Sequence, residues 1–163
     1  MTDRIFVDSN IWIYLFAAED SVKSKTVKKY ISERAEHSAL VVSYQVVNEV
    51  CCVLKKKKYT EPELRRVAKD IMGLCDVCGY SDEIIFFASE IREHYSFSYW
   101  DSQIVASALT ADCAVLASED LQDGLKIDNM SISNVLNLSS GKKEAHRGGV
   151  WDDSRSNFGI HRE

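Results

Sequence analysis

The stretch RIFVDSN at residues 4–10 decides the fold of this chain. Ile5, Phe6 and Val7 form a short apolar run typical of a buried β-strand. Asp8 ends this run, and residues 10–18 are expected to form a helical turn or two. A strand followed at once by a helix indicates the alternating pattern of an α/β domain.

The same alternation continues along the chain. Apolar runs predict further strands at 39–42, 114–117 and near 127–132. Amphipathic spacing and capping residues predict helices at 20–37, 43–57, 60–74, 81–91 and 98–108. We therefore expect an α/β fold with a mainly parallel central sheet flanked by helices.

Length and composition indicate one ordinary globular domain. The chain has 163 residues, of which 45% are hydrophobic and 28% charged. Residues 1–138 are predicted to be the folded domain, whereas 139–163 are polar and glycine-rich, which predicts a flexible tail. The longest apolar run, at 11–18, is too short to span a bilayer, and the first residues lack a signal-peptide pattern. A soluble cytoplasmic protein without a membrane partner is expected.

Charge is unevenly distributed, although the net charge is only −5. Residues 23–69 hold twelve Lys or Arg against five Asp or Glu, whereas residues 82–128 hold two against ten. The run Lys55–Lys58 fits two interpretations equally well: a solvated helix end, or an edge that contacts phosphates. The asymmetry keeps a nucleic-acid partner open.

Five cysteines, with Cys75 and Cys78 in a C-x-x-C pair, raise the alternative of a zinc site. Cys51 and Cys52 are adjacent, which is poor spacing for ligands, and no second C-x-x-C exists. We expect reduced cysteines that pack as small apolar residues.

Four acidic residues are the candidate catalytic groups. Asp8 and Asp120 each follow a predicted strand, where ligands bind in open parallel sheets. Glu49 lies on the apolar side of its helix, where a carboxylate needs a partner, a proton or a cation. Asp101 stands at the fourth place of a capping pattern that begins at Ser98. Each acid taken alone also fits a cap, a loop former or a salt bridge.

Together the four acids predict a site for a divalent cation. Converging carboxylates repel one another unless they are protonated or neutralised by a cation. Oxygen-only ligands suit Mg²⁺ or Mn²⁺, which can bind a phosphate ester and activate a water. The motifs of nucleotide-binding loops and serine hydrolases are absent from the sequence.

Four short motifs occur in a recognisable order, over about residues 3–138. They are Asp8-Ser9-Asn10, Val47-Asn48-Glu49-Val50, Tyr99-Trp100-Asp101 and Leu116-Ala117-Ser118-Glu119-Asp120. This arrangement resembles the PIN-domain family and, within it, the VapC-type toxins of toxin–antitoxin pairs. Ser9 and Ser118 stand where threonine is common in that family, which keeps the hydroxyl group.

The resemblance implies a PIN-like three-layer fold and an endoribonuclease that depends on Mg²⁺ or Mn²⁺. Asp8, Asp101 and Asp120 would be the metal ligands, and Glu49 would complete the catalytic quartet by orienting or deprotonating the water. Asn10 and Ser118 match the family's polar supports. The implied partners are RNA, a small antitoxin protein and a second copy of the chain.

Two other functions remain open at this point. The chain could be a catalytically inert PIN-fold interaction module. Alternatively, Asp8 could serve a small-molecule phosphohydrolase. Cation binding and activity on RNA distinguish these alternatives from the nuclease.

Overall fold

The computed structural model describes residues 3–17 and 20–138, and it confirms the α/β fold with a mainly parallel sheet. Within this part the sheet has six strands in the order β3-β2-β1-β4-β6-β5. The strands are β1 (Arg4–Val7), β2 (Ala39–Ser43), β3 (Asp76–Cys78), β4 (Val115–Ala117), β5 (Lys126–Ile127) and β6 (Met130–Ser133). Neighbouring strands are parallel except for β5 and β6, which pair antiparallel.

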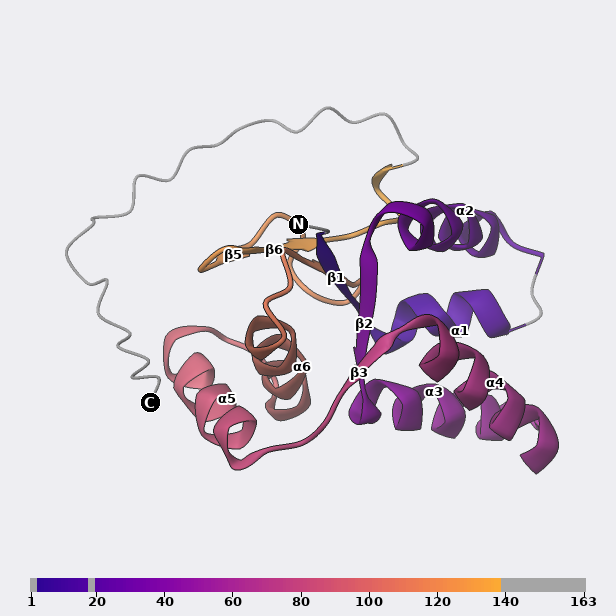
Figure 1. Cartoon of the computed structure of the whole chain (residues 1–163), viewed down its shortest axis with the longest axis horizontal. Helices are drawn as coiled ribbons and strands as arrows, with labels where there is room; N and C mark the ends of the chain where they lie inside the picture. The colour runs from indigo at the N-terminus through magenta and orange to yellow at the C-terminus, as the bar shows by residue number, and fades with distance from the viewer. Residues whose placement is uncertain (1–2, 18–19, 139–163) are drawn as a thin grey trace.

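The helices gather in two groups around the sheet. They are α1 (Ser9–Phe16), α2 (Val22–His37), α3 (Tyr44–Lys56), α4 (Glu61–Leu74), α5 (Asp82–His94) and α6 (Tyr99–Thr110). Figure 1 shows α5 and α6 as a pair on one side, apart from the group that contains α1, α3 and α4. No helix in the described ranges has the length and apolar character needed to cross a membrane.

Helix starts follow the capping residues in the sequence. The Ser43, Ser81 and Ser98 hydroxyls accept the backbone N–H of the third residue of α3, α5 and α6. At the start of α4, the Glu63 carboxylate accepts the Thr60 backbone N–H at 2.7 Å, which confirms the capping box. Local sequence therefore sets the residue at which each of these four helices begins.

The sheet departs from the sequence prediction at two places. Strand β3 was not predicted, because its three edge residues are exposed or half-buried and form no apolar run. The single strand expected near 127–132 is instead the hairpin β5–β6, whose turn places Asp128 at φ 51°. The strand predicted at 114–117 is therefore the fourth along the chain and not the third.

All five cysteines are free thiols, as expected. Burial raises the pKa of Cys75 to about 12, and it also raises the pKa of Cys78. Both side chains pack against the hydrophobic core, where the raised pKa disfavours the reactive thiolate form.

The run Lys55–Lys58 lies at the end of a helix, in agreement with the first of its two interpretations. Helix α3 ends at Lys56, and Lys58 leaves it in the left-handed region with φ 73°. Lys55 forms an ion pair with Glu61 at 2.6 Å. The alternative role in phosphate contact stays a prediction.

Strand β1 lies at the centre of the sheet, between β2 and β4, and its core residues Ile5, Phe6 and Val7 are buried. From β1 the chain continues to β2 on one side, and it later returns to β4 on the other side. Parallel sheets bind ligands beyond the carboxyl ends of strands at such a reversal. The residues that follow β1 and β4 are therefore the first candidates for a ligand site.

The domain boundary that the sequence predicts at residue 138 stays a prediction. The proposed tail, 139–163, lies outside the described residues. Its flexibility stays a prediction.

Candidate active site

Asp8 and Ser118 are brought together by the pairing of β1 with β4. Val7 lies opposite Ala117 in this pair, so the next residue of each strand reaches the same edge. The Ser118 hydroxyl donates to Asp8 Oδ2 at 2.8 Å, and the Ser9 backbone N–H donates to Asp8 Oδ1 at 2.7 Å. Asp8 is only 6% exposed and Ser118 is fully buried. The carboxylate of Asp8 is thus held at both oxygens on the floor of the site.

The environment of Asp8 works against its ionised form. Burial raises the pKa of Asp8 to about 6, although the hydrogen bonds from Ser118 and Ser9 lower it. The negative charges of Glu49 and Asp101 raise the pKa further. Asp8 therefore lies in the field of two other predicted site acids.

Asn10 links the first turn of α1 to the loop after β4. Its Nδ2 donates to Asp120 Oδ2 at 3.0 Å and to Ser118 Oγ at 3.4 Å. The same group lies 3.5 Å from Asp8 Oδ2. Asn10 Oδ1 accepts the backbone N–H of Glu119 at 3.2 Å. One amide thus fixes the position of Asp120 relative to Asp8.

Glu49 is half-buried on α3, so its predicted burial is only partly right. One helical turn later Cys52 is exposed, which shows that this face of the helix borders on solvent. The carboxylate accepts the Ser9 hydroxyl at 2.7 Å and Gln45 Nε2 at 2.8 Å. Two neutral donors, and no basic residue of the described chain, satisfy Glu49.

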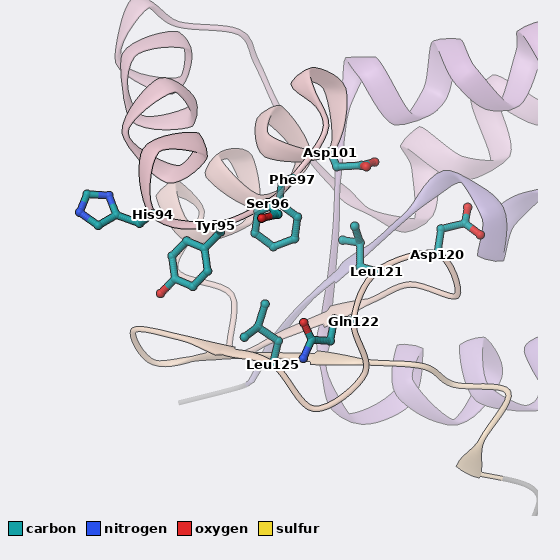
Figure 2. A pocket seen from close by; sticks show the side chains of 9 residues that line it. All are labelled: His94, Tyr95, Ser96, Phe97, Asp101, Asp120, Leu121, Gln122 and Leu125. Carbon is teal, nitrogen blue, oxygen red and sulfur yellow. The ribbon is translucent and has the colours of Figure 1, made fainter. Parts of the chain in front are cut away.

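Asp101 lies in the first turn of α6, where it keeps its capping contact. Its Oδ2 accepts the Ser98 hydroxyl at 2.7 Å, while Ser98 Oγ accepts the Asp101 backbone N–H at 3.1 Å. Gln45 Nε2 donates to the Trp100 carbonyl at 3.3 Å, so α3 and α6 meet beside this residue. Figure 2 shows Asp101 and Asp120 together at one side of a hollow.

The structure brings the predicted residues to one end of the sheet but does not arrange them as a ligand cage. Within residues 3–17 and 20–138, no three His, Cys, Asp or Glu side chains are placed to hold a metal ion. Asp101 and Asp120 instead bond to Ser98 and Asn10. The site thus has the donors for a cation without, in this conformation, the coordination geometry.

The chemistry of the donors fits a hard divalent cation. The four acids supply only oxygen atoms, as Mg²⁺ and Mn²⁺ prefer. In the described part of the chain, none of the ion pairs formed by Lys, Arg or His involves one of these four carboxylates. A partly buried acidic cluster without cationic side chains retains a negative charge that a bound cation would neutralise.

Ser9 and Gln45 were not predicted to hold Glu49. The spacing of Gln45 and Glu49, four residues apart on one helix, was the available signal. The Ser9 contact joins residues 40 positions apart, so no local pattern reveals it.

Comparison with protein families decides the relationship of this chain. The PIN domain family model matches residues 5–123, most of the chain. The chain belongs to the PIN-domain family. A search of curated protein sequences returns no match.

Solved structures share the fold of this PIN domain at low sequence identity. VapBC2 from Rickettsia felis, bound to a DNA fragment from its promoter, matches with TM-score 0.63 and 15% identity over 80% of this chain and 98% of that chain. A toxin–antitoxin complex from Klebsiella pneumoniae matches with TM-score 0.63 and 18% identity over 80% and 97%. Mycobacterium tuberculosis VapC20, a toxin that cleaves the sarcin–ricin loop, matches with TM-score 0.57 and 16% identity over 69% and 86%.

Proposed function

We propose that this PIN domain is an endoribonuclease that uses Mg²⁺ or Mn²⁺ to hydrolyse RNA phosphodiester bonds, and that it is the toxin of a toxin–antitoxin pair. The observation that carries the proposal is the environment of the Asp8 carboxylate. This carboxylate is nearly buried, it lies in the field of Glu49 and Asp101, and no described cationic side chain pairs with it. Such a group favours a bound cation over an empty site.

Each site residue receives a role in this proposal. Asp8, Asp101 and Asp120 would hold the ion, the latter two after releasing Ser98 and Asn10. A bound divalent ion stabilises the charge on a reacting phosphate and lowers the pKa of a water. Glu49, held by Ser9 and Gln45, would orient that water and take its proton.

Asn10 and Ser118 support the acids without reacting. Ser118 holds the Asp8 carboxylate in place, and Asn10 sets the position of Asp120 relative to Asp8. Supporting groups of this kind alter metal affinity about 10- to 100-fold when removed.

The toxin assignment rests on the solved structures with this fold. The Rickettsia and Klebsiella proteins are toxin–antitoxin complexes, and this chain covers nearly their whole matched length. The positive surplus of residues 23–69 suits an RNA backbone or an acidic antitoxin segment. We also propose that the protein is a homodimer, as the resemblance to VapC-type toxins implies, and that it is cytoplasmic.

A cleavage assay with a matched variant tests the proposal. Purified chain is incubated with single-stranded RNA in Mg²⁺ or Mn²⁺, with and without a chelator. We expect cleavage that the chelator stops and that Asp101→Asn reduces at least about 100-fold. Asp70→Asn, the same change at an exposed acid of α4, is the control and should cleave normally. Undiminished cleavage in chelator would contradict metal dependence.

The inert interaction module remains a second candidate because the carboxylates do not form a ligand cage. Titration calorimetry with Mn²⁺ distinguishes the two functions. Absence of both binding and cleavage would favour the module. Hydrolysis of a simple phosphate ester, but not of RNA, would instead favour a phosphohydrolase that uses Asp8.

A further inference from the structure

A hollow of about 350 Å³ opens beside Asp101 and Asp120 (Figure 2). The acids lie at one side of it, and His94 and Tyr95 lie at the other. Its volume falls within the range of small-molecule sites. The roles proposed above for the four acids do not use this space.

One wall of the hollow is aromatic. Tyr95 ends α5 with its backbone N–H bonded to the Ile91 carbonyl, and the Phe97 N–H bonds back to the Tyr95 carbonyl at 2.9 Å. This tight turn places the two rings 5.9 Å apart at an angle of 37°. Both side chains are half-buried and pack against the hydrophobic core, so the rings are held in place.

The opposite wall is the loop that follows Asp120. Leu121 is 8% exposed and Leu125 is half-buried, whereas the Gln122 side chain is exposed. Figure 2 shows Gln122 and Leu125 low in the view and Leu121 above them, below Asp101. No hydrogen bond engages the Gln122 side-chain amide within the described residues, so this group is available to a ligand.

Backbone contacts hold this loop in one conformation. Gly124 adopts φ +80°, which favours glycine, and its N–H donates to the Ile132 carbonyl at 2.9 Å. The Asp123 carboxylate accepts the Asn134 N–H at 2.8 Å and Asn137 Nδ2 at 2.9 Å. The hollow is therefore preformed.

The composition of these walls selects a flat, partly apolar ligand with a polar edge. Aromatic rings and leucine methyl groups suit the face of a nucleobase, and an amide can both donate to and accept from its edge. Asp101 and Asp120 at the mouth of the hollow repel a phosphate unless a cation is bound there. The phosphate therefore stays beside the cation and does not enter the hollow. A base stacked in a duplex does not reach such a space, whereas an unpaired base does.

We propose that the hollow is a nucleobase subsite that takes one unpaired base next to the cleaved phosphodiester. Phe97 and Tyr95 stack on the base, and Gln122 reads its edge. The proposal rests on the proposed nuclease function and adds a preferred base at one position beside the cut.

Cleavage kinetics with single-base changes test the subsite. Short single-stranded RNAs carry each of the four bases in turn at the positions flanking the cut. Phe97→Leu should raise KM for the preferred base about 5- to 100-fold while kcat changes little, because stacking on one ring is lost. Gln122→Ala should narrow the difference in kcat/KM among the four bases. Phe86→Leu, at a 67% exposed aromatic outside the hollow, is the control.

A binding measurement separates this inference from the proposed function. Fluorescence anisotropy follows the same RNAs on Asp8→Asn protein with and without Phe97→Leu, and thermal unfolding verifies that each variant is folded. Cleavage by the wild type with unchanged KM and base preference in both hollow variants would overturn the subsite and leave the nuclease standing. Binding that depends on Phe97 without any cleavage would support the subsite and remove the nuclease. Absence of both cleavage and binding would overturn both.

Discussion

Asp8 lies on the floor of the site, whereas Asp101 and Asp120 lie on its rim, and the protein holds these carboxylates in different ways. The floor residue is nearly buried and is bonded to a backbone N–H and to the fully buried Ser118 hydroxyl. Each rim carboxylate has a hydrogen bond from one neutral side chain, Ser98 or Asn10. The difference indicates that the free-energy cost of burying a charge falls mainly on Asp8, whereas Asp101 and Asp120 are each held by fewer hydrogen bonds.

Removing the floor charge should have the largest effect. Asp8→Asn preserves the shape of the side chain, and its amide can accept from Ser9 and donate to Ser118. We expect RNA cleavage to fall at least about 100-fold, because a buried ligand is lost. Rates at saturating Mg²⁺ measure this loss, with Asp70→Asn as control. Near-normal cleavage rates for Asp8→Asn would show that Asp8 is not part of the active site.

The same substitution should stabilise the protein when no cation is present. The pKa of Asp8 is about 6 in the folded chain, against an ordinary value of 3.8. Well below pH 3.8 the group is protonated in both states and has no effect on the difference. As pH rises from 3.8 to about 6, the unfolded chain gives up this proton while the folded chain keeps it. The folded state therefore loses stability over this range, by up to about 3 kcal/mol, and the loss stays constant at higher pH.

Urea unfolding in chelator at about pH 3, below the ordinary pKa of 3.8, and at about pH 7.5 checks this expectation. Asp8→Asn should match the wild type in acid and exceed its free energy of unfolding at pH 7.5. If the free energy of unfolding of Asp8→Asn exceeded that of the wild type by the same amount at both pH values, burial of the Asp8 charge would not be the cause.

Loss of the floor hydrogen bond should have an intermediate effect. Ser118→Ala removes the donor to Asp8 Oδ2, and we expect metal affinity to fall about 10-fold. Ser118→Thr keeps the hydroxyl and should restore most of that affinity. Calorimetric Mn²⁺ titration measures both variants. Equal losses in both would indicate that packing, rather than the hydrogen bond, matters at this position.

Removing the hydrogen-bond partner of a rim acid should have the smallest effect. Ser98→Ala removes a helix cap and should cost about 1 kcal/mol of stability, as should Ser81→Ala at the start of α5. Only Ser98 contacts a site acid, so only its removal frees Asp101. We expect cleavage to stay within about threefold of the wild type in both, because Asp101 would release Ser98 in any case when it binds an ion. A loss as large as that of Asp8→Asn would contradict the division into floor and rim.

The sequence predicted features that depend on neighbouring residues and missed those that depend on distant ones. Caps at Ser43, Ser81 and Ser98 were found because the pattern and the contact lie within one turn. The position of Asp8 followed from the end of an apolar run. By contrast, β3 gains its strand conformation by pairing with β2, and its own residues show no alternation.

The site showed the same limit. The strand ends predicted that Asp8 and Asp120 lie at the same edge of the sheet. The sequence did not predict that Asn10 would donate to Asp120, which lies 110 residues further along the chain. The aromatic wall formed by Tyr95 and Phe97 was not predicted, because a short turn after a helix has no periodic pattern. Side-chain partners across elements require the assembled fold.

The hydrogen bond between Asn10 and Asp120 has a consequence for biosynthesis. It joins the first helix to a loop near the end of the described chain, so ribosomes must translate most of the message before the acidic cluster exists. A polypeptide that ends before residue 120 would therefore lack both this hydrogen bond and the complete acidic cluster.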